Sequence, residues 1–545
     1  MGKRWAIALA TWVTFAGLAG ACSSSTSSEG VVSTTAAADD GAASVPATAG
    51  ATDDSTDDSS DAGSEATDAP VASGGTITVG LDSEPPTLDP AGNSLSLANG
   101  SVYAAIYETL FSFTPEDATP QPVLADSITE SEDRLSWTLT LKSGITFHDG
   151  TPFDAAAVAF NLERQKASPY NGSGLIPLTA IDVVDPLTAT LTLSEPWTAL
   201  PSVLAGINGV MVSPAAAADT ATFQRNPVGT GPYRFVEWVP TDKVVTERYE
   251  GYWGDPAPLD QLVFKFVAVE AARVAAFEGG ELDAYTTIID DTADAARDDG
   301  AQVVSPPPTG YGYAYINVTK PPFDDVRVRT ALQLAVDRDA IANAYQGQGY
   351  ADFANSPFVK DSEWWVAPET PLRYDPDEAK RLVADYGQPV SVEYKLLAGS
   401  QEIEDAIRAT VDYWIDAGID AELQLVPDLG TYITDVLTGN YDVLGFVGGS
   451  IGDPDSVVYN IFHSGGALNY GKYSNPEMDA ALEDGRRSKD DAERKADYAT
   501  VQQILREDVP VLLTSHGKIY IVASERVGGL EPSFYFPSRT VNVAA

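Results

Sequence analysis

The sequence predicts an α/β fold, because segments with the period of a strand and segments with the period of a helix alternate along most of its length. Apolar and polar residues alternate with period two in 74–81, 135–141 and 189–193, which is typical of half-buried strands. Longer segments carry apolar residues three and four positions apart, as helices do, and these are 155–167, 326–344, 376–386, 402–417 and 490–507. Mixed elements of this kind favour α/β lobes, and the chain shows no repeat of solenoid length.

Several of these elements carry signals at their ends. Gly144 and Gly150 permit the positive φ that tight turns need, and they flank a short extended segment. Asp154 and Asp375 each stand directly before a helical segment, where a side-chain oxygen caps unpaired backbone N–H groups. The glycine-rich stretch 229–232 is not followed by the Lys-Ser or Lys-Thr of a phosphate loop, so we interpret it as a tight turn.

Length, charge and cysteine count limit the classes of protein to consider. The chain has 545 residues, which is enough for two or three packed units of ordinary domain size. Its formal net charge of -46 would repel phosphate backbones, which argues against a nucleic-acid partner. A single cysteine, Cys22, excludes an intrachain disulfide and a multi-cysteine zinc site, and the three histidines are dispersed. We therefore expect no metal site and no cofactor.

The N-terminus is typical of an exported lipoprotein. Two basic residues precede an apolar run over 5–18 that is too short to span a bilayer comfortably. The run ends in the sequence LAGAC, which resembles a lipobox, although Ala19 stands where a larger aliphatic residue is more common. We therefore expect residues 1–21 to be a signal peptide and Cys22 to be lipidated, which would hold the protein at the outer face of the cell membrane.

Residues 22–73 differ in composition from everything that follows. They are mainly Ser, Thr, Ala, Gly and Asp, and they contain no aromatic residue. Such a segment cannot bury enough apolar area to offset the entropy of ordering it, so we expect a disordered acidic tether. Its acids lack the glycine and the terminal glutamate of a calcium loop, which favours a solvated spacer.

Beyond the tether, a series of short motifs extends across nearly all of the chain. They are LDSEPPTLDP (81–90), LKSGITFHDGTPFDA (141–155), NPVGTGPYRF (226–235), PFDDVRVRTAL (322–332), YDPDEAK (374–380), DPD (453–455) and YSNPEMD (473–479). Each of them alone is a weak match. In this order and together, they resemble the family 5 solute-binding proteins, which include the dipeptide, oligopeptide and nickel receptors of ABC importers.

The resemblance implies a two-lobe fold of the periplasmic-binding-protein type (cluster C), with an extra subdomain and a hinged ligand cleft. One lobe would be discontinuous, over 74–116, 227–305 and 516–545, while 117–226 would form the subdomain and 306–515 the second lobe. The protein would capture a short peptide or similar small solute by lobe closure and deliver it to the permease subunits of an ABC importer. It would act as a monomer that meets the membrane only through its lipid.

The resemblance also implies where a ligand would be held. Peptide receptors of this family pair the ligand's ammonium group with an aspartate shortly before the acidic-Pro motif, but Gly448, Gly449 and a serine occupy that stretch here. Asp453 or Asp455 would substitute for it, or would merely cap the next turn. Aromatic side chains, which bury large area at low conformational cost, are the other candidates. We expect Trp364 and Trp365 first, followed by Tyr103, Tyr107, Phe446 and Tyr470, with a role in the core as the competing interpretation.

Other functions stay open at this point. The same architecture holds receptors for non-peptide solutes such as a nickel chelate, an oligosaccharide or an opine, because distant segments set the chemistry of the pocket. No enzyme is expected, since the chain has no G-x-S-x-G elbow, no H-E-x-x-H helix and no second cysteine. A secreted glycosidase with paired carboxylates stays open, because its two acids can be far apart in the sequence. A structural adhesin also stays open, because such a protein could carry a disordered tether.

Overall fold

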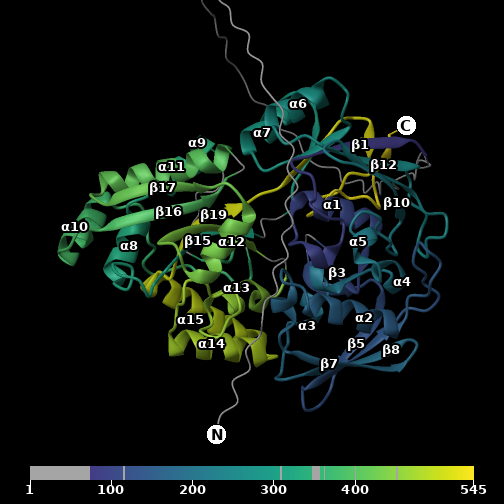
Figure 1. The fold of residues 1–545 in the computed structure, drawn as a ribbon, viewed down its shortest axis with the longest axis horizontal. Coiled ribbons are helices and arrows are strands. Elements are labelled where there is room, and N and C mark those ends of the chain that lie inside the picture. The colour runs from purple at the N-terminus through teal and green to yellow at the C-terminus, as the bar shows by residue number, and fades with distance from the viewer. Residues whose placement is uncertain are drawn as a thin grey trace, which may run out of the picture. The chain divides into compact units, whose positions relative to one another are not determined.

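The computed structural model describes residues 74–114, 117–306, 310–345, 356–360, 362–398, 401–449 and 452–544, and Figure 1 shows their arrangement. The expected signal peptide, Cys22 and the tether lie outside these residues. Within the described ranges the elements are mixed α/β, as predicted, and three sheets hold most of the strands. Among the described helices, none is both long enough and apolar enough to cross a bilayer.

The first sheet has seven strands, and the predicted opening strand lies at its centre. Strand β1 (Thr76–Leu81) runs parallel to both of its neighbours, and Ile77, Val79 and Leu81 are fully buried. The spatial order is β10 (Tyr233–Val239), β11 (Lys243–Arg248), β12 (Gln261–Phe266), β1, β13 (Ala284–Thr287), β20 (Tyr520–Ala523) and β14 (Gln302–Val304). Strand β20 therefore comes from the C-terminal end of the chain to complete a sheet that the N-terminal half begins.

Two further sheets complete the framework. The five-stranded sheet has the order β17 (Asp420–Val426), β16 (Ser391–Leu397), β18 (Val443–Gly449), β15 (Gly310–Ile316) and β19 (Val511–Gly517). The four-stranded antiparallel sheet has the order β5 (Ala125–Glu130), β6 (Ser136–Leu141), β8 (Thr188–Leu193) and β7 (Leu178–Asp185). The last sheet contains both strands predicted at 135–141 and 189–193. Short pairs join β2 (Glu108–Thr109) to β9 (Val210–Met211), β3 (Phe111–Thr114) to β4 (Asp117–Pro122), and β21 (Val527–Gly528) to β22 (Asn542–Val543).

Four of the five predicted helices are confirmed to within one residue at each end. They are α2 (Ala155–Lys166), α10 (Pro376–Tyr386), α11 (Gln401–Asp416) and α15 (Asp491–Asp508). Asp154 and Asp375 cap α2 and α10, because each accepts a hydrogen bond of 2.9 Å from a backbone N–H of the first turn. The other helices of at least one turn are α1 (Leu97–Ile106), α3 (Leu200–Val203), α4 (Pro214–Ala217), α5 (Thr220–Phe223), α6 (Glu270–Glu278), α7 (Asp290–Asp298), α12 (Leu429–Thr438), α13 (Pro454–Phe462) and α14 (Pro476–Arg487).

The single helix predicted over 326–344 is wrong, because the chain forms two helices there. Helix α8 (Val326–Leu334) is separated from α9 (Arg338–Tyr345) by a short break. Asp337 accepts a backbone N–H of α9 at 3.0 Å and so starts a second helix, while the carbonyl of Leu334 accepts an N–H from outside the helix at 2.9 Å. A continuous apolar period hid the break, since Asp337 resembles an ordinary exposed helix residue in the sequence.

The chain passes twice between the seven-stranded and the five-stranded sheet. The first passage lies between Val304 of β14 and Gly310 of β15, and the second lies between Gly517 of β19 and Tyr520 of β20. The boundary predicted between 515 and 516 falls inside β19, before the second passage. We keep the division as a working proposal: lobe I (74–116, 227–305 and 516–545), the subdomain (117–226) and lobe II (306–515).

The turn that contains His148 joins the subdomain to lobe I. Its Nε2 lies 2.9 Å from the carbonyl oxygen of Gly231, and its Nδ1 accepts the backbone N–H of Gly229 at 3.4 Å. This arrangement needs a neutral ring with the proton on Nε2. Burial lowers the pKa of His148 to about 4, an effect that the carbonyl of Gly231 partly opposes. Stretch 229–232 is thus a turn held by a histidine, in line with the interpretation from sequence.

His148 should make the stability of the folded protein depend on pH. Because its pKa is about 4 in the folded protein and about 6.5 when unfolded, the unfolded chain takes up the proton first as the pH falls. The stability that neutral His148 contributes is therefore present above pH ~6.5 and is lost towards pH ~4. In urea unfolding, the stability advantage of the parent over a His148→Gln variant should shrink by about 2–3 kcal/mol between pH 7 and pH 4.5. A constant difference would show that the ring is not held neutral.

Candidate ligand-binding cavity

A large cavity lies where lobe I, the subdomain and lobe II meet. Its volume is about 1550 Å³. Lobe I contributes residues of α1 and of the C-terminal segment 531–540, the subdomain contributes residues of 169–177 and 197–210, and lobe II contributes residues of α8, α9, α11, α12, α13 and the five-stranded sheet. We call it the interlobe cavity. Because elements from all three parts form its wall, any movement of the lobes would change it.

Tyr103, in the last turn of α1, and Tyr107, directly after the helix ends, line the lobe I side of the interlobe cavity. Their rings meet edge to face with centroids 5.6 Å apart, and both side chains are almost fully buried. Their hydroxyls donate to the carbonyl oxygens of Thr87 and Leu88 at 3.3 and 2.8 Å. Burial, reinforced by the charge of Asp89, raises the pKa of Tyr103, so the hydroxyl stays protonated and able to donate.

Lobe II supplies an opposing aromatic wall. Tyr394 packs against Trp414 with ring centroids 5.9 Å apart, and the indole N–H of Trp414 donates to a backbone carbonyl of α8 at 2.9 Å. Tyr432 of α12 donates through its hydroxyl to the carbonyl of Gly445 in β18. Tyr470 also lines the cavity, as the sequence suggested for a ligand contact. Tyr103, Tyr107 and Tyr470 are thus brought to one cavity, while their contact with a ligand stays a prediction.

The predicted pair Trp364 and Trp365 is not among the residues that line the interlobe cavity. Trp364 packs edge to face on Tyr498 of α15 with centroids 5.7 Å apart, and the guanidinium of Arg494 lies 5.2 Å from its ring centre. The backbone carbonyl of Trp364 accepts the side chain of Gln502 at 2.9 Å. Both rings are partly buried and pack against a hydrophobic core that includes residues of the five-stranded sheet and α15. The structure therefore favours the competing interpretation, a role in packing, for this pair.

Asp453 and Asp455 are both engaged within the protein. Asp453 caps α13 by accepting the N–H of Asp455 at 2.9 Å, and it accepts the guanidinium of Arg494 at 2.5 Å. Asp455 lines the interlobe cavity, where it accepts Nε of Arg486 at 2.9 Å and the indole N–H of Trp197 at 2.9 Å. Asp453 therefore caps a helix, which was the predicted alternative to binding an ammonium group. Asp455 is paired with a buried arginine.

Three of the predicted ligand residues lie in β18, where the side-chain environment is outside the described part of the structure. They are Phe446, Gly448 and Gly449. The backbone of this strand pairs with β15, so that Phe446 is opposite Tyr313. Tyr313 lines the interlobe cavity. This register places β18 beside a cavity-lining strand, and the ligand role of its three residues stays a prediction.

The C-terminal segment 531–540 is a part of the cavity wall that the sequence analysis missed. Tyr535 of this segment packs on Gly100 of α1 so closely that a Cβ at that position would come within 2.1 Å of the ring. The backbone N–H of Phe536 donates to the hydroxyl of Ser101 at 3.3 Å. The aromatic run over 534–536 was a usable signal, but it follows the last motif of the family and carries no helical or strand period.

Several charged groups in the described wall are engaged by other groups of the protein. Asp455 is paired with Arg486, Glu108 with Arg539, and Lys518 with Asp290. The guanidinium of Arg338 donates to two backbone carbonyls at 3.2 and 2.7 Å, and burial lowers the pKa of Arg338 to about 10. Within the described residues, no group of three or more His, Cys, Asp or Glu side chains is placed to hold a metal ion.

Sequence comparison relates the chain to solute-binding proteins. Residues 119–469 match the middle domain of the bacterial extracellular solute-binding proteins, family 5. The glutathione-binding protein GsiB of Pectobacterium atrosepticum is 31% identical over 484 residues, which cover 85% of this chain and 91% of that protein. GsiB of Escherichia coli O157:H7 is 30% identical over 456 residues, which cover 80% of this chain and 87% of that protein.

Solved structures share the fold. The binding protein AgaA of A. tumefaciens R10, in complex with agropinic acid, has a TM-score of 0.77 and 25% identity, covering 86% of this chain and 99% of its own. DppA of Helicobacter pylori, in complex with the peptide STSA, has a TM-score of 0.77 at 22% identity, covering 87% and 99% of the two chains. Together with the sequence match, these similarities show that the chain has the two-lobe fold of periplasmic binding proteins and belongs to the bacterial extracellular solute-binding proteins, family 5.

Proposed function

We propose that the protein captures a short peptide, or a solute of similar size, in the interlobe cavity and delivers it to the permease of an ABC importer. The observation that carries the proposal is the cavity itself, at about 1550 Å³, with aromatic walls from both lobes. Pockets for drug-sized ligands typically measure ~300–1,000 Å³, so this one suits a larger ligand such as a peptide of several residues. Relatives that bind glutathione and a tetrapeptide support this ligand class.

A non-peptide solute is the second candidate, and one feature of the wall favours it. The family resemblance implies an acid for the ligand's ammonium group near the acidic-Pro motif, but Asp453 and Asp455 there are both held by arginines. A ligand without a free α-ammonium group would not need either of them. Agropinic acid, bound by AgaA, and the nickel-histidine complex, bound by NikA of Staphylococcus aureus, are available test compounds of other chemical classes.

In this proposal the protein holds its ligand without chemistry and meets the membrane only through a lipid on Cys22. The wall contains aromatic rings, and several of its charges are paired within the protein, which suits reversible capture. The protein would act as a monomer outside the cytoplasm. If Cys22 carries the lipid, a fatty-acid analogue fed to the host should label the protein. The Cys22→Ser variant should not be labelled.

Ligand binding should raise the melting temperature of the protein. A ligand present at 100 times its Kd stabilises the native state by about 2.7 kcal/mol, which corresponds to a rise of roughly 5–10 °C for lobes of this size. We expect such a rise with glutathione or with one of a set of di- to pentapeptides, measured on Cys22→Ser protein. Agropinic acid and nickel-histidine form the comparison arm. Native mass spectrometry of protein from its own host would identify a retained molecule.

Two outcomes would contradict the proposal. If no compound of the panel shifts the melting temperature and the protein from its host carries no molecule, the receptor function loses its support. If peptides or glycans are instead converted with many turnovers per protein molecule, the protein is an enzyme. A rise with agropinic acid or nickel-histidine alone would replace the peptide by the second candidate.

A further inference from the structure

The subdomain and lobe II touch through a buried contact at the edge of the interlobe cavity. Trp197, in the loop between β8 and α3, is 2% exposed, and its indole N–H donates to Oδ2 of Asp455 at 2.9 Å. Asp455 lies in the first turn of α13 in lobe II, 258 residues further along the chain. Both residues line the cavity. The bond therefore joins two parts of the fold at the place where a ligand would be enclosed.

The acceptor in this bond is itself part of a buried ion pair. Arg486, at the end of α14, donates to Asp455 through Nε at 2.9 Å and through Nη2 at 3.1 Å. Arg486 and Arg487 also reach across to Glu195 of the subdomain, at 3.4 and 2.9 Å. Hydrogen bonds to a carboxylate in a site shielded from water are stronger than those between neutral groups. Trp197 thus supplies a third donor, from the opposite side, to a carboxylate that lobe II already holds.

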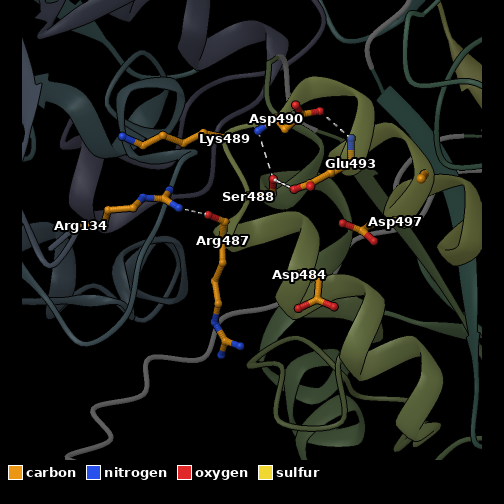
Figure 2. A pocket seen from close by; sticks show the side chains of 9 residues that line it. Arg134, Asp484, Arg487, Ser488, Lys489, Asp490, Glu493 and Asp497 are labelled. Atoms are coloured by element: carbon orange, nitrogen blue, oxygen red, sulfur yellow. Dashed lines mark hydrogen bonds between the residues drawn. The ribbon is translucent and has the colours of Figure 1, made fainter. Parts of the chain in front are cut away.

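The end of α14 provides a second set of contacts between the same two parts. The carbonyl of Arg486 accepts the backbone N–H of Thr198 at 3.2 Å, and the carbonyl of Ser488 accepts the hydroxyl of Thr198 at 2.9 Å. Figure 2 shows the guanidinium of Arg134 donating to the carbonyl of Arg487. The last carbonyls of a helix have no partner inside the helix. Here the subdomain provides those partners, so the end of α14 is completed by groups of another part of the fold.

We propose that Trp197 and Thr198, with Asp455 and the end of α14, form a latch that holds the subdomain against lobe II in the closed protein. The proposal rests on the proposed function, because it assigns a role in lobe closure. Opening would expose Asp455 and the carbonyls of α14 to water. It would break the bonds that cross from the subdomain to lobe II, while the pair of Asp455 and Arg486, which lies within lobe II, would stay intact. The latch therefore gives the closed form stability that does not come from the ligand, and Trp197 acts as a positioning residue.

The latch also has a consequence for affinity. When only the closed form holds a ligand firmly, the apparent Kd equals the intrinsic Kd divided by the fraction of closed protein. Weakening the latch lowers that fraction and raises the apparent Kd for every ligand by the same factor. A residue that contacts the ligand would instead change affinity by different factors for different ligands. This difference separates a latch from a ligand contact at Trp197.

The test uses a Trp197→Phe variant, which keeps the aromatic ring and removes the N–H donor. Trp137→Phe is the matched control, because the indole N–H of Trp137 in the same subdomain is buried without a hydrogen-bond partner. Cys22→Ser removes the single cysteine, so that Val184→Cys and Leu437→Cys can carry spin labels on the subdomain and lobe II. Both positions are 63% exposed. Protein freed of retained ligand by refolding from denaturant is then measured by double electron–electron resonance.

We expect the ratio of short to long label distances to fall about tenfold or more in Trp197→Phe, as for the loss of a hydrogen bond to a charged acceptor. Trp137→Phe should keep the distribution of the parent. Thr198→Val removes the hydrogen bond from the hydroxyl to the carbonyl of Ser488. This variant should also shift the distance distribution towards long distances. Thr198→Val also serves as the test if Trp197→Phe does not unfold cooperatively.

Parent-like distances in Trp197→Phe, in Thr198→Val and in their combination would overturn the latch. The proposed function would survive that result if a ligand still raised the melting temperature. Conversely, a shift in the distances without binding of any compound would support the latch and remove the proposed function. Equal loss of affinity for every compound that binds, in Trp197→Phe but not in Trp137→Phe, is the expected companion result.

Discussion

Replacing Asp455 with alanine should lower the free energy of unfolding by about 3–5 kcal/mol, because it leaves the buried guanidinium of Arg486 without its counter-charge. The side chains of Asp455 and Arg486 are 2% and 5% exposed. Burial opposes the charge on Arg486, but Asp455, together with Tyr459 and Glu195, outweighs that effect and raises the pKa of Arg486. The indole N–H of Trp197 would lose its acceptor in the same variant. Urea unfolding of the parent and the variant measures the difference.

A double-mutant cycle provides the control for this result. Arg486→Met alone removes the charge that Asp455 needs and should destabilise the protein by a similar amount. The double variant Asp455→Ala with Arg486→Met leaves neither charge buried, so it should be more stable than the sum of the two single changes predicts. Strictly additive effects, or a loss below ~1 kcal/mol for Asp455→Ala, would show that the pair is solvated and contributes little.

Signals carried by neighbouring residues predicted the elements of the fold well. Asp375, Pro376 and the apolar period after them define α10 at both ends, because an N-cap, a first-turn proline and the helical period depend only on nearby residues. Strand β1 was predicted in the same way from its alternation. The break between α8 and α9 was missed, because Asp337 starts a new helix inside an apolar period that continues across it.

The cavity was predictable only in part, since its contacts join residues that are distant in the chain. Tyr103 and Tyr107, which the sequence suggested only as aromatic candidates, line the cavity. Asp455 looked like an acid for a ligand, but its partners, Trp197 and Arg486, are 258 and 31 residues away. Sequence distance of this kind hides which charges are already paired. The same reason explains why the sequence did not show that Trp364 and Trp365 pack against a core instead of lining the cavity.

Glu108 is the second position where a large loss is expected, because one buried carboxylate serves three donors. Its side chain is fully buried, and it accepts the hydroxyl of Tyr252 at 2.9 Å, the indole N–H of Trp253 at 2.7 Å and the guanidinium of Arg539 at 2.6 Å. Burial and the charge of Glu108 both raise the pKa of Tyr252, which keeps that hydroxyl a donor. Glu108→Ala should therefore cost about 3–5 kcal/mol of unfolding free energy.

The three donors differ in exposure, which separates the effect of the carboxylate from that of the ion pair. Arg539 is 47% exposed at its side chain, so Arg539→Gln should cost no more than ~1 kcal/mol. Glu108→Gln keeps one acceptor oxygen, so its loss of unfolding free energy should lie between those of Glu108→Ala and Arg539→Gln. Because Arg539 lies in the segment 531–540 that lines the cavity, Glu108→Ala should also make this segment a site of limited proteolysis in the native protein. Equal stabilities for Glu108→Ala and Arg539→Gln would mean that only the exposed ion pair matters, and that Tyr252 and Trp253 find other acceptors.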